Sequence, residues 1–113
     1  MIKGVGVDIV ENNRFSSFPQ GALDKIFTHK ELDELNHRVD KTEFLASRFA
    51  VKEAVVKAYG TGFGVIGARD IEVNNDDKGK PYVLVKGKKD EKLHISLSHE
   101  STCSIAFAVL EES

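Results

Sequence analysis

The segment from Lys41 to Tyr59 contains no glycine or proline, and its apolar residues are spaced for a helix that is buried on most sides. Asp40 can cap its N-terminus. Glu43 stands three residues further on, which is the spacing of a capping box. Gly60 can adopt the left-handed conformation that commonly ends a helix. We therefore predict one long central helix on which the rest of the chain packs.

Glu53 is unusual in this helix because it lies in an apolar stripe, between Phe49 and Lys57 on one face. Burying an unpaired carboxylate is costly, so Glu53 needs a cation or hydrogen-bond donors. One interpretation is an ordinary i,i+4 pair with Lys57, which stabilises a helix by about 0.2–0.5 kcal/mol. In the other, Glu53 holds a metal ion and Lys57 faces an anion. The helix alone favours the ordinary pair.

The remaining segments predict an α+β fold with a mostly antiparallel sheet, because one strand is followed by helices and then by a meander of strands. In the first strand, over residues 1–10, Val5, Val7 and Ile9 occupy one face, and glycines occupy the other. Asp8 is the one charge on the glycine face, and by its spacing alone it would be a turn or cap residue. Short helices are predicted over 22–27 and 30–38, and strands over 70–74, 81–86, 92–99 and 103–109.

The composition fits one domain over residues 1–113. The formal net charge is −2, so the chain has no overall basic field for nucleic acid. Cys103 is the only cysteine, which excludes an intrachain disulfide and is compatible with a reducing compartment. Lys3 and Asp8 interrupt any apolar region near the N-terminus, and no apolar run approaches the length of a membrane span. We expect a cytoplasmic protein that binds neither nucleic acid nor membrane.

Three segments carry more specific motifs. They are GVGVDIV at 4–10, FLASRFAVKEAVVKAYGTG at 44–62 and ISLSHE at 95–100, with GKPY at 79–82 as support. Together they resemble the holo-acyl-carrier-protein synthase family, the small 4′-phosphopantetheinyl transferases. The resemblance runs almost from end to end, and RFAVKEAVVKA is its most specific part. It implies the fold of that family, with one long helix packed on an antiparallel sheet.

The resemblance implies a reaction and a metal site. Such a protein moves the 4′-phosphopantetheine arm of coenzyme A to a serine of an apo acyl carrier protein and releases adenosine 3′,5′-bisphosphate, usually in fatty acid synthesis. The family needs Mg²⁺, and Asp8 and Glu53 match its metal-binding carboxylates. Lys57 matches a lysine that would contact the pyrophosphate or protonate the leaving group. The base that activates the carrier serine stays open between Asp8, Glu53 and a water molecule on the metal.

The same resemblance assigns contacts with coenzyme A. Arg48 would reach the phosphates of coenzyme A, as would Lys57. Lys52 could do the same or be solvated, which is the usual state of a helix lysine. His99, which closes the ISLSH piece, is expected near the 3′-phosphate or the adenine. Three further residues are expected to line the nucleotide pocket: Gly60, Thr61 and Pro81.

The resemblance also implies two kinds of protein partner. Arg14 matches an arginine that docks the acidic carrier protein, for which a basic surface is expected. Family members of this length are homotrimers with sites at subunit interfaces. A strand face of small residues, Ala106 and Ala108, would be the exposed surface used for association.

Two other functions stay open at this point. The first is a module of the same fold that binds coenzyme A or a nucleotide without catalysis. The second is a structural or regulatory oligomer in which Glu53 and Lys57 merely pair.

Overall fold

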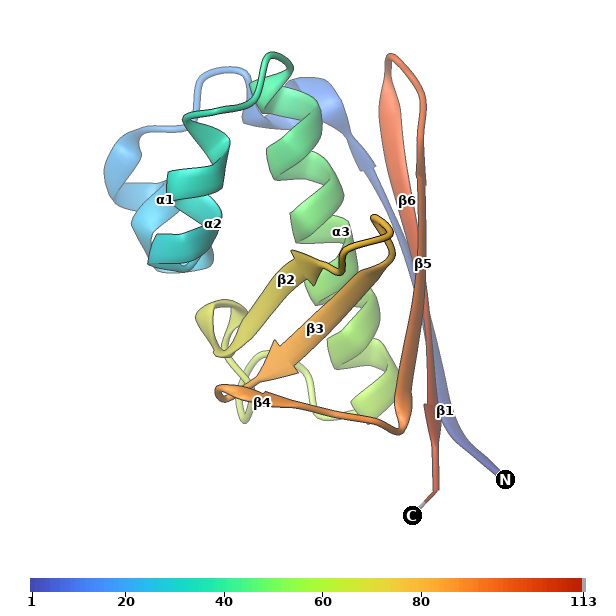
Figure 1. Ribbon diagram of the computed structural model, residues 1–113. Coiled ribbons are helices and arrows are strands. Elements are labelled where there is room, and N and C mark those ends of the chain that lie inside the picture. Colours follow the sequence, from blue (N-terminus) through green and yellow to red (C-terminus); the bar gives the residue numbers. More distant parts are fainter. Residues whose placement is uncertain (113) are drawn as a thin grey trace.

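Helix α3 (Lys41–Tyr59) runs through the middle of the computed structural model, which describes residues 1–112 (Figure 1). Two antiparallel sheets of three strands lie around it, with the orders β1-β6-β5 and β2-β3-β4. The strands are β1 (Ile2–Glu11), β2 (Ile71–Asn75), β3 (Pro81–Val85), β4 (Lys88–Lys89), β5 (Leu93–His99) and β6 (Cys103–Glu111). The short helices are η1 (Asn12–Phe15), α1 (Gln20–Ile26), α2 (His29–Leu35) and η2 (Ala68–Asp70).

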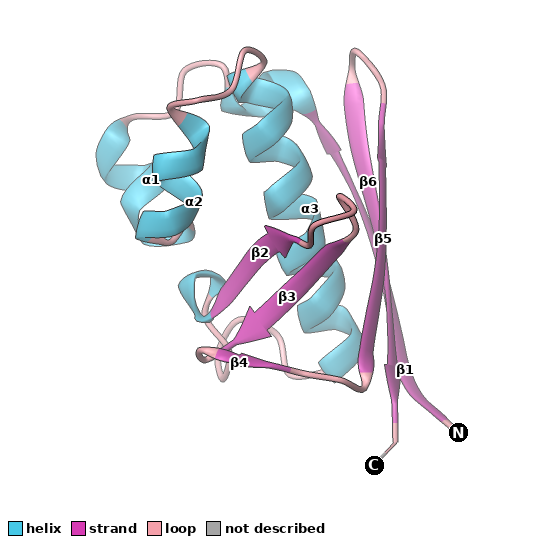
Figure 2. Cartoon of the chain, viewed as in Figure 1, coloured by secondary structure: helices cyan, strands magenta, loops and turns pink. Residues whose placement is uncertain are grey.

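Helix α3 lies between the first sheet and the short helices α1 and α2 (Figure 2). The predicted α+β class with a long central helix is confirmed. The strands form two sheets rather than one, and a short strand that was not predicted, β4, pairs with β3. Within residues 1–112, every helix is too short or too polar to cross a lipid bilayer.

The ends of α3 follow the sequence signals with one exception. Asp40 caps the helix, since its carboxylate accepts a hydrogen bond from the backbone N–H of Glu43 at 3.2 Å. Gly60 ends the helix with a φ of 76°. The carboxylate of Glu43 does not complete the predicted capping box, because its Oε1 atom instead lies 3.2 Å from Nδ1 of His99. A complete capping box opens α2, between Thr28 and Glu31.

Strand β1 lies directly on the backbone of α3. A Cβ atom built on Gly6 would be 1.9 Å from the carbonyl oxygen of Ala54, and one on Gly4 would be 2.0 Å from that of Ala58. Only glycine permits so close an approach of two backbones. Asp8 follows on the same face of the strand, so this contact brings its carboxylate to the helix.

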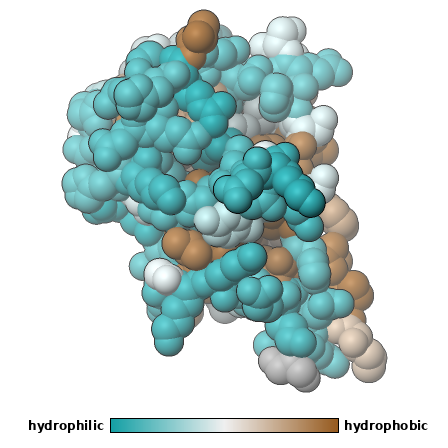
Figure 3. All heavy atoms as spheres, viewed as in Figure 1, coloured by the Kyte–Doolittle hydropathy of each residue, from teal (hydrophilic) through white to brown (hydrophobic). Residues whose placement is uncertain are grey.

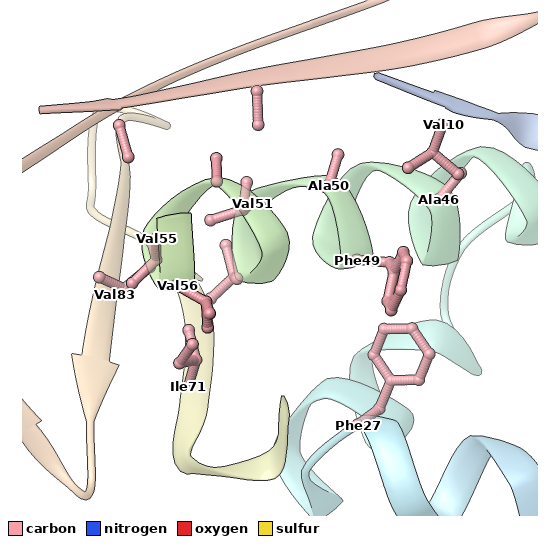
Figure 4. Packing of buried hydrophobic residues seen from close by; sticks show 14 of the residues in the cluster. Val10, Phe27, Ala46, Phe49, Ala50, Val51, Val55, Val56, Ile71 and Val83 are labelled. Atoms are coloured by element: carbon pink, nitrogen blue, oxygen red, sulfur yellow. The ribbon is translucent and has the colours of Figure 1, made fainter. Parts of the chain in front are cut away.

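The interior is filled from both sides of α3. Ala46 and Ala50 point toward the strands of the first sheet, whereas Phe49 points toward Phe27 on the other side (Figure 4). Phe15 packs edge-on against both of these phenylalanine rings. Small side chains thus face the sheet, and large ones fill the space under the short helices.

The exposed face of the first sheet is apolar, and it is not the face that we predicted. Ala106 and Ala108 are fully buried against α3. The large residues on the opposite side are exposed, as in the cross-strand pair of Val7 (50% exposed) and Phe107 (46%). We call this surface the outer apolar face; its residues are Val5, Val7, Ile9, Ile105 and Phe107. Figure 3 shows hydrophobic atoms along the side of the molecule where this sheet lies.

Replacing Gly6 by alanine should destabilise the protein by at least about 3 kcal/mol, the upper end of the usual cost of overpacking. The new methyl group would overlap a helix carbonyl that cannot move without shifting α3. Urea unfolding measures the loss. Gly21→Ala, in helix α1 with no atom within 4 Å of the new methyl group, is the control and should leave stability unchanged or slightly raised. A loss below 1 kcal/mol for Gly6→Ala would contradict the close contact.

Candidate functional site

Asp8, Glu53 and Lys57 meet where β1 crosses α3. The Lys57 ammonium donates a hydrogen bond to the carbonyl oxygen of Val7 at 2.9 Å, and its Nζ atom is 3.3 Å from Oδ1 of Asp8. Its salt bridge therefore runs to the strand, and the ordinary pair with Glu53 is not the contact that Lys57 makes. Glu53 precedes Lys57 by one helical turn and is half-buried. We call these three residues the carboxylate cluster.

The two carboxylates of this cluster repel one another. Partial burial raises the pKa of Glu53, and the negative charge of Asp8 raises it further, whereas Lys57 and Arg14 lower it. Two carboxylates beside one ammonium leave an excess negative charge. Hard oxygen ligands of this kind suit a cation such as Mg²⁺, which commonly takes one or two carboxylates and completes its shell with water and phosphate. Within residues 1–112, no group of three or more His, Cys, Asp or Glu side chains could hold a metal ion.

Arg14 lies at the edge of the carboxylate cluster. Its guanidinium carbon is 5.0 Å from the centroid of the Phe49 ring, and Phe49 precedes Glu53 by one turn. The side chain of Arg14 is exposed. A cation in this position can contact a molecule that approaches the cluster from outside.

A second group of predicted residues lines a cavity of about 550 Å³ near the N-terminal end of α3. Arg48, Pro81 and His99 all border it, together with Ser47 and Phe44. The ring of His99 is held by Glu43, as described above. Such a volume is typical of a small-molecule site. Because the family resemblance assigns Arg48, Pro81 and His99 to the nucleotide end of coenzyme A, we call it the nucleotide cavity.

Arg48 is the most constrained cation of the nucleotide cavity. The residue is only 5% exposed, and within residues 1–112 its Nε and Nη2 atoms have no hydrogen-bond partner. Burial lowers the pKa of Arg48, and the negative charge of Glu34 opposes this effect. A buried guanidinium with unused N–H groups is suited to bind the oxygens of an anion.

The carboxylate cluster and Arg48 lie on opposite sides of α3. Lys57 follows Arg48 by nine positions, which at about 100° per residue is two and a half turns. The residues predicted to contact coenzyme A are therefore divided between two sides of α3, with Lys57 on one side and Arg48 on the other. Gly60 and Thr61 do not line the nucleotide cavity. They are exposed at the C-terminal end of α3, where the N–H group of Gly60 donates to the carbonyl oxygen of Lys57 at 3.1 Å.

The position of Lys52 differs from the prediction that it contacts a phosphate or is solvated. It is neither solvated nor near either group of candidate site residues. Its side chain is fully buried, and Nζ is 2.8 Å from Oε1 of Glu31 and 3.0 Å from the carbonyl oxygen of Ala68. It also donates to the carbonyl oxygen of Ile71. Glu31 in turn accepts from the backbone N–H groups of Thr28 and Val73. The capping-box pattern at Thr28 and Glu31 was the available signal, but it does not reveal that Glu31 also binds a lysine.

Several residues of the nucleotide cavity were not predicted from the sequence, among them a cation and an aromatic residue. Arg38 and Phe44 both line the cavity. Arg38 is the last residue of the helix predicted over 30–38, where it was given no role in a site, and Phe44 was interpreted only as part of an apolar helix. The one sequence signal for Arg38 was that a basic residue stands just before the helix that carries Arg48.

The two lysines of α3 should respond differently to the same substitution. Lys52→Met leaves Glu31 buried without its cation and should cost about 3–5 kcal/mol of stability. Lys57→Met removes an ammonium whose side chain is 52% exposed and should cost less than about 1 kcal/mol. Chemical denaturation of both variants measures the difference. Equal losses would show that the buried pair is not what holds α2 to α3.

Glu53→Gln should stabilise the metal-free protein at neutral pH and not at acid pH. Since the pKa of Glu53 is raised in the folded state, its neutral form stabilises the fold at low pH, and that contribution is lost as the pH rises through the folded pKa. Glutamine stays neutral throughout. Unfolding measured with a chelator from pH 4 to pH 8 should show the variant gaining on the wild type as the pH rises.

Glu100→Gln makes the same chemical change at an exposed position and should follow the wild type at every pH. A wild type that stays more stable than Glu53→Gln at pH 8 would contradict the unfavourable environment of the Glu53 carboxylate.

Comparison with known proteins gives the same family along the whole chain. The family model described as the 4′-phosphopantetheinyl transferase superfamily matches residues 4–109. A holo-[acyl-carrier-protein] synthase of Halothermothrix orenii is 44% identical over 99% of both chains. A Bacillus anthracis holo-(acyl-carrier-protein) synthase, solved in complex with CoA (3′,5′-ADP), is 40% identical with a TM-score of 0.88 and covers 100% of this chain and 99% of its own. A Neisseria meningitidis holo-[acyl-carrier-protein] synthase is 34% identical with a TM-score of 0.87, over 99% of this chain and 100% of its own. The chain belongs to the 4′-phosphopantetheinyl transferase superfamily.

Proposed function

We propose that this chain, as one domain over residues 1–113, transfers 4′-phosphopantetheine from coenzyme A to a serine of an apo acyl carrier protein in the cytoplasm. The carrier is that of fatty acid synthesis, and the by-product is adenosine 3′,5′-bisphosphate. Family membership supports the reaction. The observation that carries the site is the convergence of Asp8, Glu53 and Lys57 at the contact between β1 and α3. A nearly buried arginine with free N–H groups supports an anionic substrate.

Asp8 and Glu53 would hold one Mg²⁺ ion, which neutralises charge on the pyrophosphate and on the leaving bisphosphate when it is bound. Lys57 uses two of its three N–H donors on the carbonyl oxygen of Val7 and on Asp8. The third donor and the 52% exposure of the side chain leave it able to contact a phosphate oxygen or to give a proton to the leaving group.

Glu53 is also a candidate for the base that removes the proton of the carrier serine. In the protein without a metal ion, burial and the negative charge of Asp8 raise the pKa of Glu53, which makes it a stronger base. Arg14, exposed at the edge of the cluster, would contact the acidic carrier as the serine approaches.

The nucleotide cavity would hold the other end of coenzyme A. Arg48 and His99 supply positive or hydrogen-bonding groups for the phosphates, and Pro81 lies in the wall. Because Arg48 and Lys57 point to opposite sides of α3, we infer that one chain does not present both to the same molecule of coenzyme A. We therefore place the complete site between two copies of the chain, in a homotrimer.

The outer apolar face is the surface for this association. Its exposed valine, isoleucine and phenylalanine side chains form a continuous apolar surface on paired strands β1 and β6, and such surfaces mark interfaces. A module that binds coenzyme A without catalysis is the second candidate, because the free N–H groups of Arg48 favour anion binding whether or not transfer follows.

Incubating the protein with coenzyme A, Mg²⁺ and an apo acyl carrier protein should raise the intact mass of the carrier by one phosphopantetheine. Asp8→Ala, Glu53→Ala and a chelator should each slow the transfer at least about a hundredfold, the scale of losing one electrostatic element of an active site. Glu100→Ala is the control for an exposed carboxylate. Binding of coenzyme A with no mass gain on any carrier would favour the non-catalytic module, and full transfer by Glu53→Ala would refute the metal site.

Phe107→Lys should convert a trimer into monomers, because it places a charge in the centre of the outer apolar face. Light scattering coupled to gel filtration measures the mass, and circular dichroism shows that the chains stay folded. Val65→Lys, at another exposed apolar position (66% exposed), should remain trimeric and active. A monomeric Phe107→Lys variant with unchanged transfer would show that each chain has a complete site of its own.

A further inference from the structure

The cations of the nucleotide cavity already have a carboxylate partner. Oε2 of Glu34, on helix α2, is 3.7 Å from Nη2 of Arg48. The same oxygen forms a closer ion pair with Nη2 of Arg38, one turn further along the chain. Both arginines line the cavity, and Glu34 contacts them from outside its lining. One carboxylate therefore faces two guanidinium groups.

Phe44 holds the two guanidinium groups in place. The Cζ atoms of Arg38 and Arg48 lie 5.0 and 4.4 Å from the centroid of its ring. A guanidinium stacked on an aromatic ring keeps its N–H edge available for a second partner. Here that partner is Glu34 or the oxygens of a ligand.

The Glu34 carboxylate leaves Arg48 incompletely satisfied. At 3.7 Å its oxygen is too far from Nη2 for a hydrogen bond. Nε and Nη2 of Arg48 accordingly have no hydrogen-bond partner within residues 1–112, although the residue is almost fully buried. Glu34 thus supplies charge to Arg48 without occupying the hydrogen-bond donors Nε and Nη2.

We propose that Glu34 is a built-in competitor of the phosphate groups of coenzyme A. Its carboxylate neutralises Arg38 and Arg48 in the ligand-free protein and weakens the binding of a phosphate in the nucleotide cavity. The inference rests on the proposed function, because it takes the nucleotide end of coenzyme A as the ligand. Repulsion between the Glu34 carboxylate and a bound phosphate about 7 Å away, at an effective dielectric constant of about 40, weakens the binding of the phosphate roughly tenfold.

Glu34→Gln keeps the shape of the side chain and removes its charge. Calorimetry without Mg²⁺, with adenosine 3′,5′-bisphosphate as the probe, should give a Kd about tenfold lower for this variant than for the wild type. The matched control is Asp33→Asn, which makes the same charge change on the neighbouring exposed residue of α2 and should stay within twofold of the wild type. In an Arg48→Met background the gain from Glu34→Gln should largely disappear.

The possible outcomes separate this proposal from the proposed function. If the wild type binds the bisphosphate and Glu34→Gln binds it no more tightly, the role of Glu34 is wrong and the proposed function stands. An equal gain in Asp33→Asn would mean that only net charge matters, which also overturns the role of Glu34. A wild type that binds neither the bisphosphate nor coenzyme A overturns both.

A second measurement uses the wild-type chain and does not depend on the folding of a variant. The carbon-13 signal of the Glu34 carboxyl group should shift when adenosine 3′,5′-bisphosphate is added, because its arginine partners turn to the ligand. The Asp33 carboxyl signal is the internal reference. A Glu34 signal that stays unchanged while the probe saturates the cavity would overturn the proposal.

Discussion

The contact between strand β1 and helix α3 is the constraint on which the rest of the structure depends. Gly4 and Gly6 bring the strand backbone against helix carbonyl groups at a distance that any side chain would prevent. The alanines of β6 extend the same flat surface, so the first sheet lies closely along the helix. Asp8 follows the glycines on this face, and the approach that packs the core therefore also places a carboxylate beside Glu53 and Lys57.

The charged residues of α3 differ because each faces a different neighbour. Lys52 points into the interior, where Glu31 and two carbonyl groups surround its ammonium. Arg48 is almost equally buried, but it borders a cavity and retains unused donors. Lys57 faces the strand and remains half-exposed. Neighbouring positions on one helix thus serve stability, anion binding and the carboxylate cluster.

Local signals predicted the elements of this fold well. The bounds of α3, its Asp40 cap and its Gly60 end follow from the sequence because a helix is determined by residues near it in the chain. Partners far apart in the sequence were not predictable in this way. The pairing of Lys52 with Glu31, and of Glu43 with His99, requires the relative positions of α2, α3 and β5.

The exposed face of the first sheet was predicted incorrectly for the same kind of reason. Alternation in β6 separates the alanines from Ile105 and Phe107, but it does not say which set faces the helix. The size of the gap decides this, since only small residues fit where β1 and β6 lie against α3. The family resemblance named the candidate residues, and only the structure divided them between two sides of a helix.

Two cations of the candidate sites have a carboxylate beside them, since Lys57 has Asp8 and Arg48 has Glu34, and the carboxylate of Glu43 lies beside the ring of His99. An anionic ligand that binds here competes with the internal carboxylates for these cations. Its net binding energy is therefore the difference between its own attraction to the cations and the attraction of the carboxylates to them. A phosphate group with two negative charges and three oxygens attracts them more strongly than a carboxylate does. Ligands with a single carboxylate gain little by comparison. This competition favours multiply charged phosphates, and it does so with side chains that also keep the ligand-free protein electrostatically balanced.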